Sequence, residues 1–298
     1  MPTRFIALDW GTTSFRAYRV GDDATVLESL SAPHGILSVA VGAFDATLES
    51  HIGAWDVSLP ILASGMITSR QGWIELPYVT TPANLTSIAG ALHVHTSSRG
   101  RKIHFVPGVS TRGNDGMPDV MRGEETQVMG ASKGGAEYFV TPGTHCKWIN
   151  VDNGAITGFS TYMTGEVFST LKNHSILGRL MTGDTHYEAA FEKGVRAALK
   201  DAGGFLHRIF STRTLALFNE LSHDELASYL SGQVIGTEIA HATANHPMGV
   251  RYNILASPAL AQHYVSAMKL AGLQVQFSPP DVAVTGLHKI AANAGVIP

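Results

Sequence analysis

Cysteine is almost absent from this chain of 298 residues, which contains a single one, Cys146. One cysteine excludes an internal disulfide framework and a metal site built from several cysteines, and it fits a reducing compartment. Charged residues make up only 15% of the chain, and the formal net charge is -3. We therefore expect no broad electrostatic attraction to nucleic acid or to an anionic membrane, so any bound anion must be held by local groups.

Long apolar runs are missing as well. The chain has no stretch of about 18 uninterrupted apolar residues, which a membrane-spanning helix needs. Its start, MPTRFIALDWG, has no basic region followed by a long apolar core, so no secretory signal is predicted. These absences favour a cytoplasmic protein. The 44% of hydrophobic residues is enough for a large core, and the length suggests two domains of roughly 130 to 160 residues.

The first half of the chain opens with a predicted β-hairpin. FIALDWGTTSFRAYRV reads as strand, tight turn and strand because apolar residues flank a Gly-Thr-Thr-Ser cluster, and VLESLSA extends it to a three-stranded antiparallel meander. Further strands are expected in PILASGMI and KIHFVPGVS, and helical spacing is found over residues 41–52 and 119–132.

The second half repeats this opening in outline. EYFVTPGTHCKWINVDNGAITGFSTYM predicts three strands joined by a Gly-Thr turn and by a turn at Asn153 and Gly154, both of which tolerate positive φ. A helix capped by Thr164 follows. The repetition indicates a duplicated mixed α/β plan with a boundary near Lys133, giving domains 1–133 and 134–298.

The rest of the second half alternates helices with strands. Helical patterns cover residues 187–200 and 223–245, and RYNILASPALAQHYVSAMKLAG reads as a strand that feeds a helix through a Ser-Pro turn. After this helix we expect a short strand, a turn at residues 285–287 and a terminal helix.

The first turn has the composition of a phosphate site. Backbone N–H groups and hydroxyls of such a turn can cradle phosphate oxygens, and a carboxylate beside it can hold a hydrated magnesium ion. An ordinary hairpin, whose polar residues satisfy only local hydrogen bonds, is the alternative. The residues concerned are Asp9, Gly11, Thr12, Thr13 and Ser14.

The second turn strengthens that interpretation because it occupies the corresponding place in the second half. Two such turns could hold a polyphosphate together, with positive charge added by a lysine or a histidine. The residues concerned are Gly143, Thr144, His145 and Lys147.

Several ordered motifs together resemble a known family. The paired turns resemble the actin-like ATPase and sugar kinase superfamily. ILASGMITSRQGWIELPYV, DVMRGEETQVMGA, TPGTHCKWINV and MTGEVFSTLKNHSILG narrow the resemblance to the 2-dehydro-3-deoxygalactonokinase family over essentially the whole chain. The resemblance implies an α/β fold of two ribonuclease H-like domains, with mixed sheets flanked by helices and an ATP cleft between the domains.

The resemblance also implies an activity and roles for residues. It implies ATP-dependent phosphorylation of the 6-hydroxyl of 2-dehydro-3-deoxy-D-galactonate, a step in galactonate breakdown. Asp9 would hold hydrated Mg²⁺, and the two turns would contact the phosphates of ATP. The adenosine would lie near Ala256, Ser257, Pro258, Gly286 and Leu287.

Two positions depart from the wider superfamily. Its second phosphate motif often begins with an aspartate, where this chain has Thr141 and Pro142. The common glycine of its adenosine motif is Ala256 here. Metal placement at the second turn and the nucleotide contact at Ala256 therefore cannot be copied from the superfamily.

Phosphoryl transfer needs a carboxylate that accepts the proton of the attacking hydroxyl. The candidates are Asp119, Glu124, Glu125 and Glu166. The RGEETQ segment resembles a segment of exopolyphosphatases in which a glutamate is the base, so Glu124 ranks first and Glu125 second. The alternative is that both are solvated helix carboxylates.

Arginine is the natural partner of the substrate's carboxylate. The candidates are Arg16, Arg70, Arg112 and Arg122, with Arg70 and Arg122 preferred. Ser64, Gly65 and Met66 are expected to form the pocket wall, and Trp73 packs either on the sugar chain or in the core. His93 and His95 share one strand face but lack acidic or cysteine partners, which disfavours zinc, and His174 is assigned a structural hydrogen bond.

Two other functions use the same turns: an exopolyphosphatase-like phosphohydrolase with water as the acceptor, and a non-catalytic ATP-dependent sugar sensor. The sensor is disfavoured because no helix-turn-helix segment with a basic face precedes the first turn. The galacto or gluco preference and the oligomeric state, with a homodimer among the options, are left open.

Overall fold

The computed structural model describes residues 2–113, 115–244, 246, 249–278 and 282–298. The chain divides into two compact units: residues 1–137, 149–159 and 279–298 form the first, and residues 138–148 and 160–278 form the second. These limits do not coincide with 1–133 and 134–298, and the assignment of ribonuclease H-like domains to those ranges stays a prediction.

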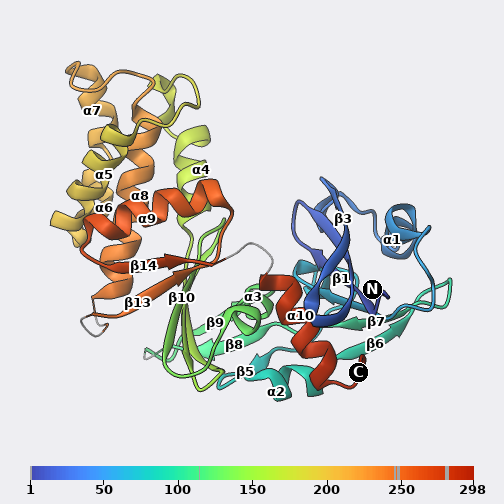
Figure 1. The fold of residues 1–298 in the computed structure, drawn as a ribbon. Coiled ribbons are helices and arrows are strands. Elements are labelled where there is room, and N and C mark those ends of the chain that lie inside the picture. Colours follow the sequence, from blue (N-terminus) through green and yellow to red (C-terminus); the bar gives the residue numbers. More distant parts are fainter. Residues whose placement is uncertain (1, 114, 245, 247–248, 279–281) are drawn as a thin grey trace. The chain divides into compact units, whose positions relative to one another are not determined.

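The largest sheet of the first unit has six strands in the order β3-β2-β1-β4-β7-β6 (Figure 1). Antiparallel pairing joins β1, β2 and β3, whereas β4 is parallel to β1 and β7 is parallel to β4. The predicted meander is confirmed. The bounds are β1 Phe5–Trp10, β2 Phe15–Val20, β3 Val26–Ala32, β4 Ile61–Ser64, β6 His93–Thr96 and β7 Lys102–Phe105.

The first unit also contains a three-stranded sheet, parts of β11 (Cys146–Asp152) and β12 (Ala155–Tyr162), and four α-helices among its described residues. The sheet has the order β5-β8-β9, with bounds β5 Val79–Thr80, β8 Val109–Arg112 and β9 Pro118–Met121. The helices are α1 Phe44–Ile52, α2 Leu85–Gly90, α3 Glu124–Ala131 and α10 Val282–Asn293. The core gathers side chains from β1, β2, β4, β7 and α1, including Trp10 and Phe15, whose rings meet edge to face at 4.8 Å.

The second large sheet has the order β12-β11-β10-β13-β14. If the strands are numbered from the start of each half of the chain, the first four positions of both sheets are occupied in the order 3-2-1-4. This shared strand order confirms the duplicated mixed α/β plan. The bounds are β10 Glu137–Thr141, β11 Cys146–Asp152, β12 Ala155–Tyr162, β13 Arg251–Ile254 and β14 Gln274–Phe277. The turn between β11 and β12 has positive φ at Asn153 (49°) and Gly154 (76°), as predicted.

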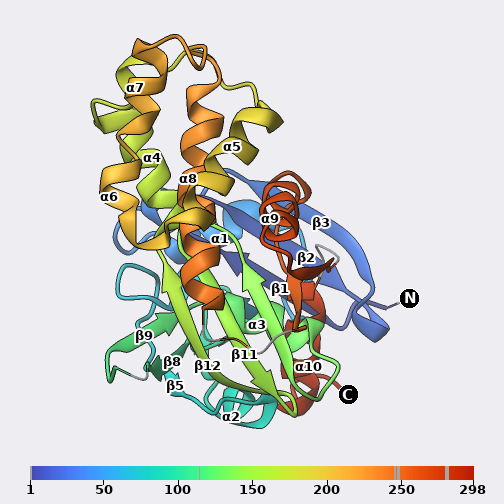
Figure 2. The ribbon, with the colours of Figure 1, turned by 90° about the vertical axis from the view of Figure 1, so that its left-hand side faces the viewer.

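Helices make up most of the remainder of the second unit. Their bounds are α4 Thr164–His174, α5 Glu188–Lys200, α6 Phe205–Arg208, α7 Ser211–Leu217, α8 Leu226–Thr243 and α9 Pro258–Leu270. Helices α5 and α8 run side by side (Figure 2). Glycines allow this close approach, because a Cβ on Gly232 would lie 2.1 Å from the carbonyl oxygen of Phe191. Short 3-10 turns occupy Asp22–Ala24, Ile36–Ser38, Met66–Thr68, Gly178–Leu180 and Ala202–Gly204.

Three expectations about local structure were wrong. The segment 119–132 is not one helix, because residues up to Met121 pair with β8 and Gly123 has a φ of 106°, which a helix cannot contain. KIHFVPGVS is divided between β7 and β8. Thr164 does not cap α4: it is the first helical residue, and its hydroxyl bonds the side chain of Glu238.

The expected turn at residues 285–287 is also wrong, because these residues lie inside α10. Helix α10 packs closely on α3 within the first unit (Figure 1). A Cβ on Gly286 would lie 1.8 Å from the carbonyl oxygen of Thr126, so the glycine serves the contact between helices and not a turn.

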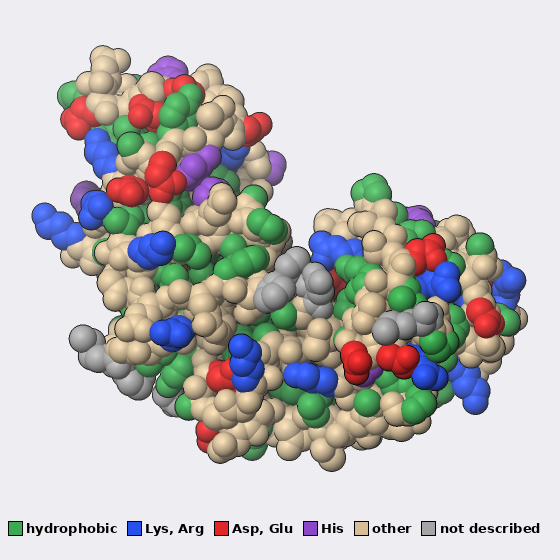
Figure 3. All heavy atoms as spheres, in the orientation of Figure 1, with side chains coloured by type: hydrophobic (Ala, Val, Ile, Leu, Met, Phe, Trp, Pro, Cys, Tyr) green, Lys and Arg blue, Asp and Glu red, His purple; other side chains and the backbone are tan. Residues whose placement is uncertain are grey.

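On the face drawn in Figure 3, Lys and Arg side chains are scattered and alternate with Asp and Glu. Among the described residues, no helix is both long enough and apolar enough to cross a membrane.

Candidate functional site

The first turn joins β1 to β2 as a tight hairpin. Trp10 and Phe15 face each other at the ends of the strands, and the N–H of Gly11 donates to the carbonyl oxygen of Ser14 at 2.9 Å. Thr12 and Thr13 are exposed, and within the described residues their N–H groups donate to no backbone carbonyl. Among the described residues, these two donors are therefore not used by the backbone of the hairpin.

The outer side of this turn is braced by the loop that leads into the 3-10 turn Ile36–Ser38. The N–H of Ile36 donates to the carbonyl oxygen of Gly11 at 3.0 Å, and that of Leu37 donates to the carbonyl oxygen of Thr12 at 3.3 Å. A Cβ on Gly35 would lie 2.2 Å from that oxygen of Thr12, so only glycine fits there. The carbonyl groups of the turn are thus engaged.

Asp9 lies just before the turn, beside the end of the parallel strand β4. Its side chain is 24% exposed, and Arg16 Nη1 lies 3.2 Å from Oδ2. Burial raises the pKa of Asp9, Arg16 opposes that rise, and the nearby charge of Glu124 adds to it. A Cβ on Gly65 would lie 3.2 Å from Asp9 Oδ1, so Gly65 leaves space at this carboxylate.

The N-terminus of α3 brings the two glutamates to the same region. A Cβ on Gly123 would lie 3.3 Å from the Cα of Gly65, which itself lies against Asp9. Glu124 Oε2 accepts the N–H of Arg122 at 3.0 Å. Asp9, Gly65 and Glu124 are therefore neighbours within the first unit, although they come from three separate segments.

Glu125 is more deeply buried than Glu124. Its side chain is buried, and its two oxygens accept the N–H of Gly123 at 2.9 and 2.7 Å. Burial raises the pKa of Glu125 to about 8, and the charge of Glu124 adds to the rise. The third candidate, Asp119, lies on β9 and accepts the N–H of Val120.

The predicted substrate arginines differ in their surroundings. Arg122 donates from Nη1 to Thr68 Oγ1 at 2.9 Å and from Nη2 to the carbonyl oxygen of Leu76 at 2.6 Å, and it stacks 4.0 Å over the ring of Tyr78. Arg122 thus braces the first unit internally. Arg70 is exposed, whereas Arg112 donates to a carbonyl oxygen of its own β8–β9 hairpin.

The expected pocket wall lies at the end of β4. Ser64 is buried, with its hydroxyl 3.5 Å from the carbonyl oxygen of Leu8, and Met66 packs against the core. Trp73 packs among aromatic rings of that core: it stacks on Phe44 at 6.2 Å and meets Phe105 edge to face at 5.6 Å. Of the two alternatives for Trp73, packing on the sugar chain or packing in the core, the structure supports packing in the core.

The second turn joins β10 to β11 and lies against the start of α4. A Cβ on Gly165 would lie 2.4 Å from the carbonyl oxygen of Gly143, and the N–H of Glu166 donates to the carbonyl oxygen of Thr144 at 3.1 Å. In the part of the chain that the structure describes, the N–H groups of Gly143, Thr144 and His145 donate to no backbone carbonyl. In this respect the second turn resembles the first.

His145 and Lys147, beside the second turn, differ in their burial. His145 Nε2 lies 2.5 Å from Glu166 Oε2, and both side chains are about half exposed. Lys147 is buried, and its ammonium lies 3.4 Å from the carbonyl oxygen of His145. Glu166, a candidate base, is therefore paired with a residue of this turn.

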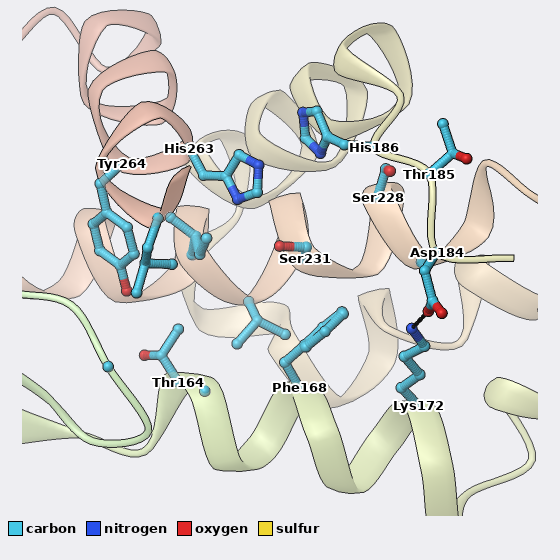
Figure 4. Close-up of a pocket in the computed structure, with 16 residues that line it drawn as sticks. Thr164, Phe168, Lys172, Asp184, Thr185, His186, Ser228, Ser231, His263 and Tyr264 are labelled. Atoms are coloured by element: carbon cyan, nitrogen blue, oxygen red, sulfur yellow. Dashed lines mark hydrogen bonds and ion pairs between the residues drawn. The ribbon is translucent and has the colours of Figure 1, made fainter. Parts of the chain in front are cut away.

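Gly143 of the second turn lines a pocket of about 260 Å³ in the second unit. Its walls come from α4, α8, α9 and residues 184–186, and they are mainly apolar (Figure 4). His186 and His263 stack at 4.2 Å between ring centroids, and Lys172 pairs with Asp184 at 2.6 Å. The lining includes Thr164, Phe168, Ser231, Leu260, His263 and Tyr264.

The expected adenosine residues are divided between the two units. Ser257 is the N-cap of α9 and Pro258 its first residue, so they begin the helix that carries one wall of this pocket. Gly286 and Leu287 are buried on α10 in the first unit. Sequence reasoning missed the pocket residues because apolar positions on α4, α8 and α9 have the same spacing as core positions.

The histidines do not form a metal site in the part of the structure that is described. Among those residues, no group of three His, Cys, Asp or Glu side chains could hold an ion. His93 and His95 lie on β6, where His95 packs against Trp73. His174 ends α4 and is exposed.

Comparisons with known proteins found matches over nearly the whole chain. The model of the family described as 2-keto-3-deoxy-galactonokinase matches residues 9–290. A relative from Rhizobium meliloti (strain 1021), named "Probable 2-dehydro-3-deoxygalactonokinase", is 36% identical, and 97% of each chain is covered. The 2-dehydro-3-deoxygalactonokinase of Escherichia coli (strain K12) is 32% identical, and 98% of each chain is covered.

Solved structures agree with these matches. The crystal structure of a candidate 2-dehydro-3-deoxygalactonokinase from Sinorhizobium meliloti has a TM-score of 0.90 at 36% identity, covering 96% of this chain and 98% of that chain. Component A of the (R)-2-hydroxyglutaryl-CoA dehydratase from Acidaminococcus fermentans has a TM-score of 0.53 at 12% identity, covering 97% and 98%, and shows similarity of fold alone. The fold is mixed α/β, and the chain belongs to the 2-keto-3-deoxy-galactonokinase family.

Proposed function

We propose that this protein transfers the terminal phosphoryl group of ATP to the 6-hydroxyl of 2-dehydro-3-deoxy-D-galactonate in galactonate breakdown. The observation that carries the proposal is the family match over residues 9–290, with curated relatives of that name at 36% and 32% identity over nearly the full chain. The single cysteine fits a reducing compartment, and we place the reaction in the cytoplasm.

The first turn is proposed to hold the terminal phosphates through Gly11, Thr12, Thr13 and Ser14. The N–H groups of Thr12 and Thr13, which have no backbone acceptor among the described residues, support this role. Asp9 fits Mg²⁺ because it offers one partly exposed carboxylate, and Mg²⁺ usually keeps several waters and takes its other ligands from phosphates. Bound Mg²⁺ would neutralise the charge that develops on the transferred phosphoryl group.

The second turn is proposed to contact phosphate through Gly143, Thr144 and His145, with the charge of Lys147 close beneath. The nucleoside is proposed to lie in the pocket that begins at Gly143. Its apolar walls suit a purine base, and the helix that Ser257 and Pro258 begin supplies one of them. This assignment keeps Ala256, Ser257 and Pro258 near the nucleoside and leaves out Gly286 and Leu287.

Glu124 is proposed as the general base. A base must be ionised before it accepts a proton. Glu125, with a pKa of about 8, is mostly protonated at neutral pH, and its oxygens are occupied by the N–H of Gly123. Glu124 lies beside Asp9, where Mg²⁺ and the transferred phosphate are proposed to be, and is therefore preferred.

Arg70 is proposed to bind the substrate carboxylate because its guanidinium is exposed, whereas Arg122 is bonded to Thr68 and Leu76. Arg122 would then position the segment that carries Thr68, which follows Ser64, Gly65 and Met66. Arg16 is proposed to orient Asp9 through their contact at 3.2 Å.

The test is a coupled ADP-release assay over a panel of aldonates and 2-keto-3-deoxyaldonates. The proposal expects turnover that depends strictly on 2-dehydro-3-deoxy-D-galactonate, with mass spectrometry showing phosphate on its 6-oxygen. Phosphate release without any sugar acid would support the phosphohydrolase, and ATP binding without turnover would support the sensor. A preference for the gluco epimer would contradict the proposed substrate but would still support the proposed phosphoryl transfer from ATP.

A further inference from the structure

A buried carboxyl group, Glu238 on α8, lies outside every role assigned above. Its side chain is 3% exposed. Trp148 Nε1 donates to Oε1 at 2.7 Å, the hydroxyl of Tyr264 donates to Oε2 at 2.7 Å, and the hydroxyl of Thr164 also donates to Oε2. One side chain thus joins α8 to β11, α9 and the first residue of α4.

Burying a carboxyl group is costly unless hydrogen bonds compensate for the lost water. Burial raises the pKa of Glu238, while the three donors oppose that rise. An apolar residue would avoid this cost but would leave three donors without their acceptor. The arrangement suits a group whose task is to fix several elements in one geometry.

The same cluster reaches the second turn through Cys146. The hydroxyl of Tyr264 lies 2.8 Å from Cys146 Sγ, and the Cys146 thiol lies 3.6 Å from the carbonyl oxygen of Gly143. Cys146 begins β11, immediately after the turn, and Thr164 begins α4, which packs on the turn through Gly165. Glu238 therefore holds the starts of both elements that support residues 143–145.

Two members of the cluster also line the pocket. Thr164 and Tyr264 line the cavity at the same end (Figure 4). Movement of either side chain would change the pocket wall and the turn together. The first turn and the candidate base belong to the first unit and have no part in this cluster.

We propose that Glu238 is a positioning residue: by accepting hydrogen bonds from Trp148, Thr164 and Tyr264, it fixes the second turn and the adjoining pocket wall in the geometry that binds ATP. The inference rests on the proposed binding of ATP by this turn. It assigns Glu238 no contact with ATP and no proton transfer.

The test compares Glu238→Met with Glu238→Gln. Methionine has a similar length but no acceptor oxygen, whereas the amide of glutamine can accept from Trp148 and donate to the hydroxyls of Thr164 and Tyr264. E238M is expected to raise the KM for ATP about tenfold and to change the KM for the sugar acid less than about twofold, and E238Q is expected to restore both values to near wild type.

Cys146 gives a second readout that needs no ATP. It is the only cysteine of the chain, it is buried, and burial raises its pKa to about 12, so it should react slowly with an aromatic disulfide reagent. In the folded, ligand-free protein, E238M is expected to increase that reaction rate at least about tenfold, and E238Q is expected to keep it near wild type.

Gln233→Leu is the matched control, because Gln233 is buried on the same helix and bonds Thr212, away from the turn. It is expected to change thermal stability but neither the KM for ATP nor the reactivity of Cys146. If E238M does not fold, Tyr264→Phe, which breaks the link between Glu238 and Cys146, is expected to give both effects more weakly.

Two results for E238M would overturn the positioning role. One is wild-type reactivity of Cys146 together with an unchanged KM for ATP. The other is an equal change in the KM of both substrates. Loss of the proposed function would look different: the wild-type chain would show no ATP-dependent turnover, while the Cys146 rates would still decide whether Glu238 fixes the turn.

Discussion

The two turns share a backbone plan but differ in what surrounds them. The first follows an aspartate that pairs with Arg16, and main-chain bonds from Ile36 and Leu37 brace it. The second follows Thr141 and Pro142, and it rests on the start of α4 and on side chains held by Glu238. The same loop is thus preceded by a carboxylate in the first unit and by Thr141 and Pro142 in the second.

Each turn also has a buried glutamate nearby, and the two are satisfied differently. Glu125 accepts from the backbone, at the N–H of Gly123, whereas Glu238 accepts from three side chains. Burial raises the pKa of both. The comparison predicts that changes at the first turn lower the rate of phosphoryl transfer and that changes at the second weaken nucleotide binding.

The largest effect is expected for Asp9→Asn. The amide keeps the size of the side chain but removes the charge proposed to hold hydrated Mg²⁺, so kcat should fall about 10³-fold with a smaller change in the KM for ATP. The coupled ADP-release assay at saturating Mg²⁺ measures it. His145→Gln, at the second turn, should instead change mainly the KM for ATP; a reversed pattern would undo the distinction between the turns.

A smaller loss is expected for Glu124→Gln, with Glu125→Gln as its matched control. Removing the base should lower kcat about 10²-fold. Glu125 is already mostly protonated at pH 7, and glutamine resembles the protonated form, so E125Q should lose less than about threefold in kcat. Steady-state kinetics of both variants decide this, and full activity in E124Q would remove Glu124 as the base.

The pH dependence of stability should reveal Glu125. Its pKa rises from an ordinary value of 4.5 to about 8 in the folded chain, so the unfolded chain releases this proton first and wild-type stability falls as the pH rises from about 5 to 8. E125Q cannot ionise and should lose less stability over that range, by about 3 to 4 kcal/mol. Thermal unfolding of both proteins at several pH values measures it, and parallel curves would contradict the raised pKa.

The smallest effect is expected for Gly165→Ala. The added Cβ would lie 2.4 Å from the carbonyl oxygen of Gly143, so α4 or the second turn must shift, and the KM for ATP should rise about fivefold with kcat nearly unchanged. Gly158→Ala is the control, because its Cβ would meet only Thr111 Oγ1 at 3.9 Å. Equal kinetics in the two variants would show that the turn tolerates the shift.

Local signals in the sequence were sufficient for the hairpins. Gly11 to Ser14 and the Asn153-Gly154 pair lie between alternating apolar residues, and turn chemistry depends on the few residues in the turn itself. The prediction of one helix over 119–132 was wrong because residues 118–121 form β9 by pairing with β8. The local sequence pattern contains no information about this pairing partner.

The candidate site could be predicted only in part. The motifs named Asp9 and Glu124, and the fold brings them together through Gly65 and Gly123. They also named Glu125, Arg122 and Trp73, and only the structure shows these three packed internally. A sequence motif gives residue identity and spacing, whereas burial depends on what packs against the side chain.

By itself, the sequence determined the two donor-rich turns, the duplicated strand pattern and the kinase family. Tertiary structure alone decided that α10 packs on α3, that a pocket adjoins Gly143, and that Glu238 meets Trp148, 90 residues away. The physical reason is range: turn geometry and strand alternation follow from neighbouring residues, but burial and hydrogen bonding of a side chain depend on partners that only the folded chain brings within a few ångströms.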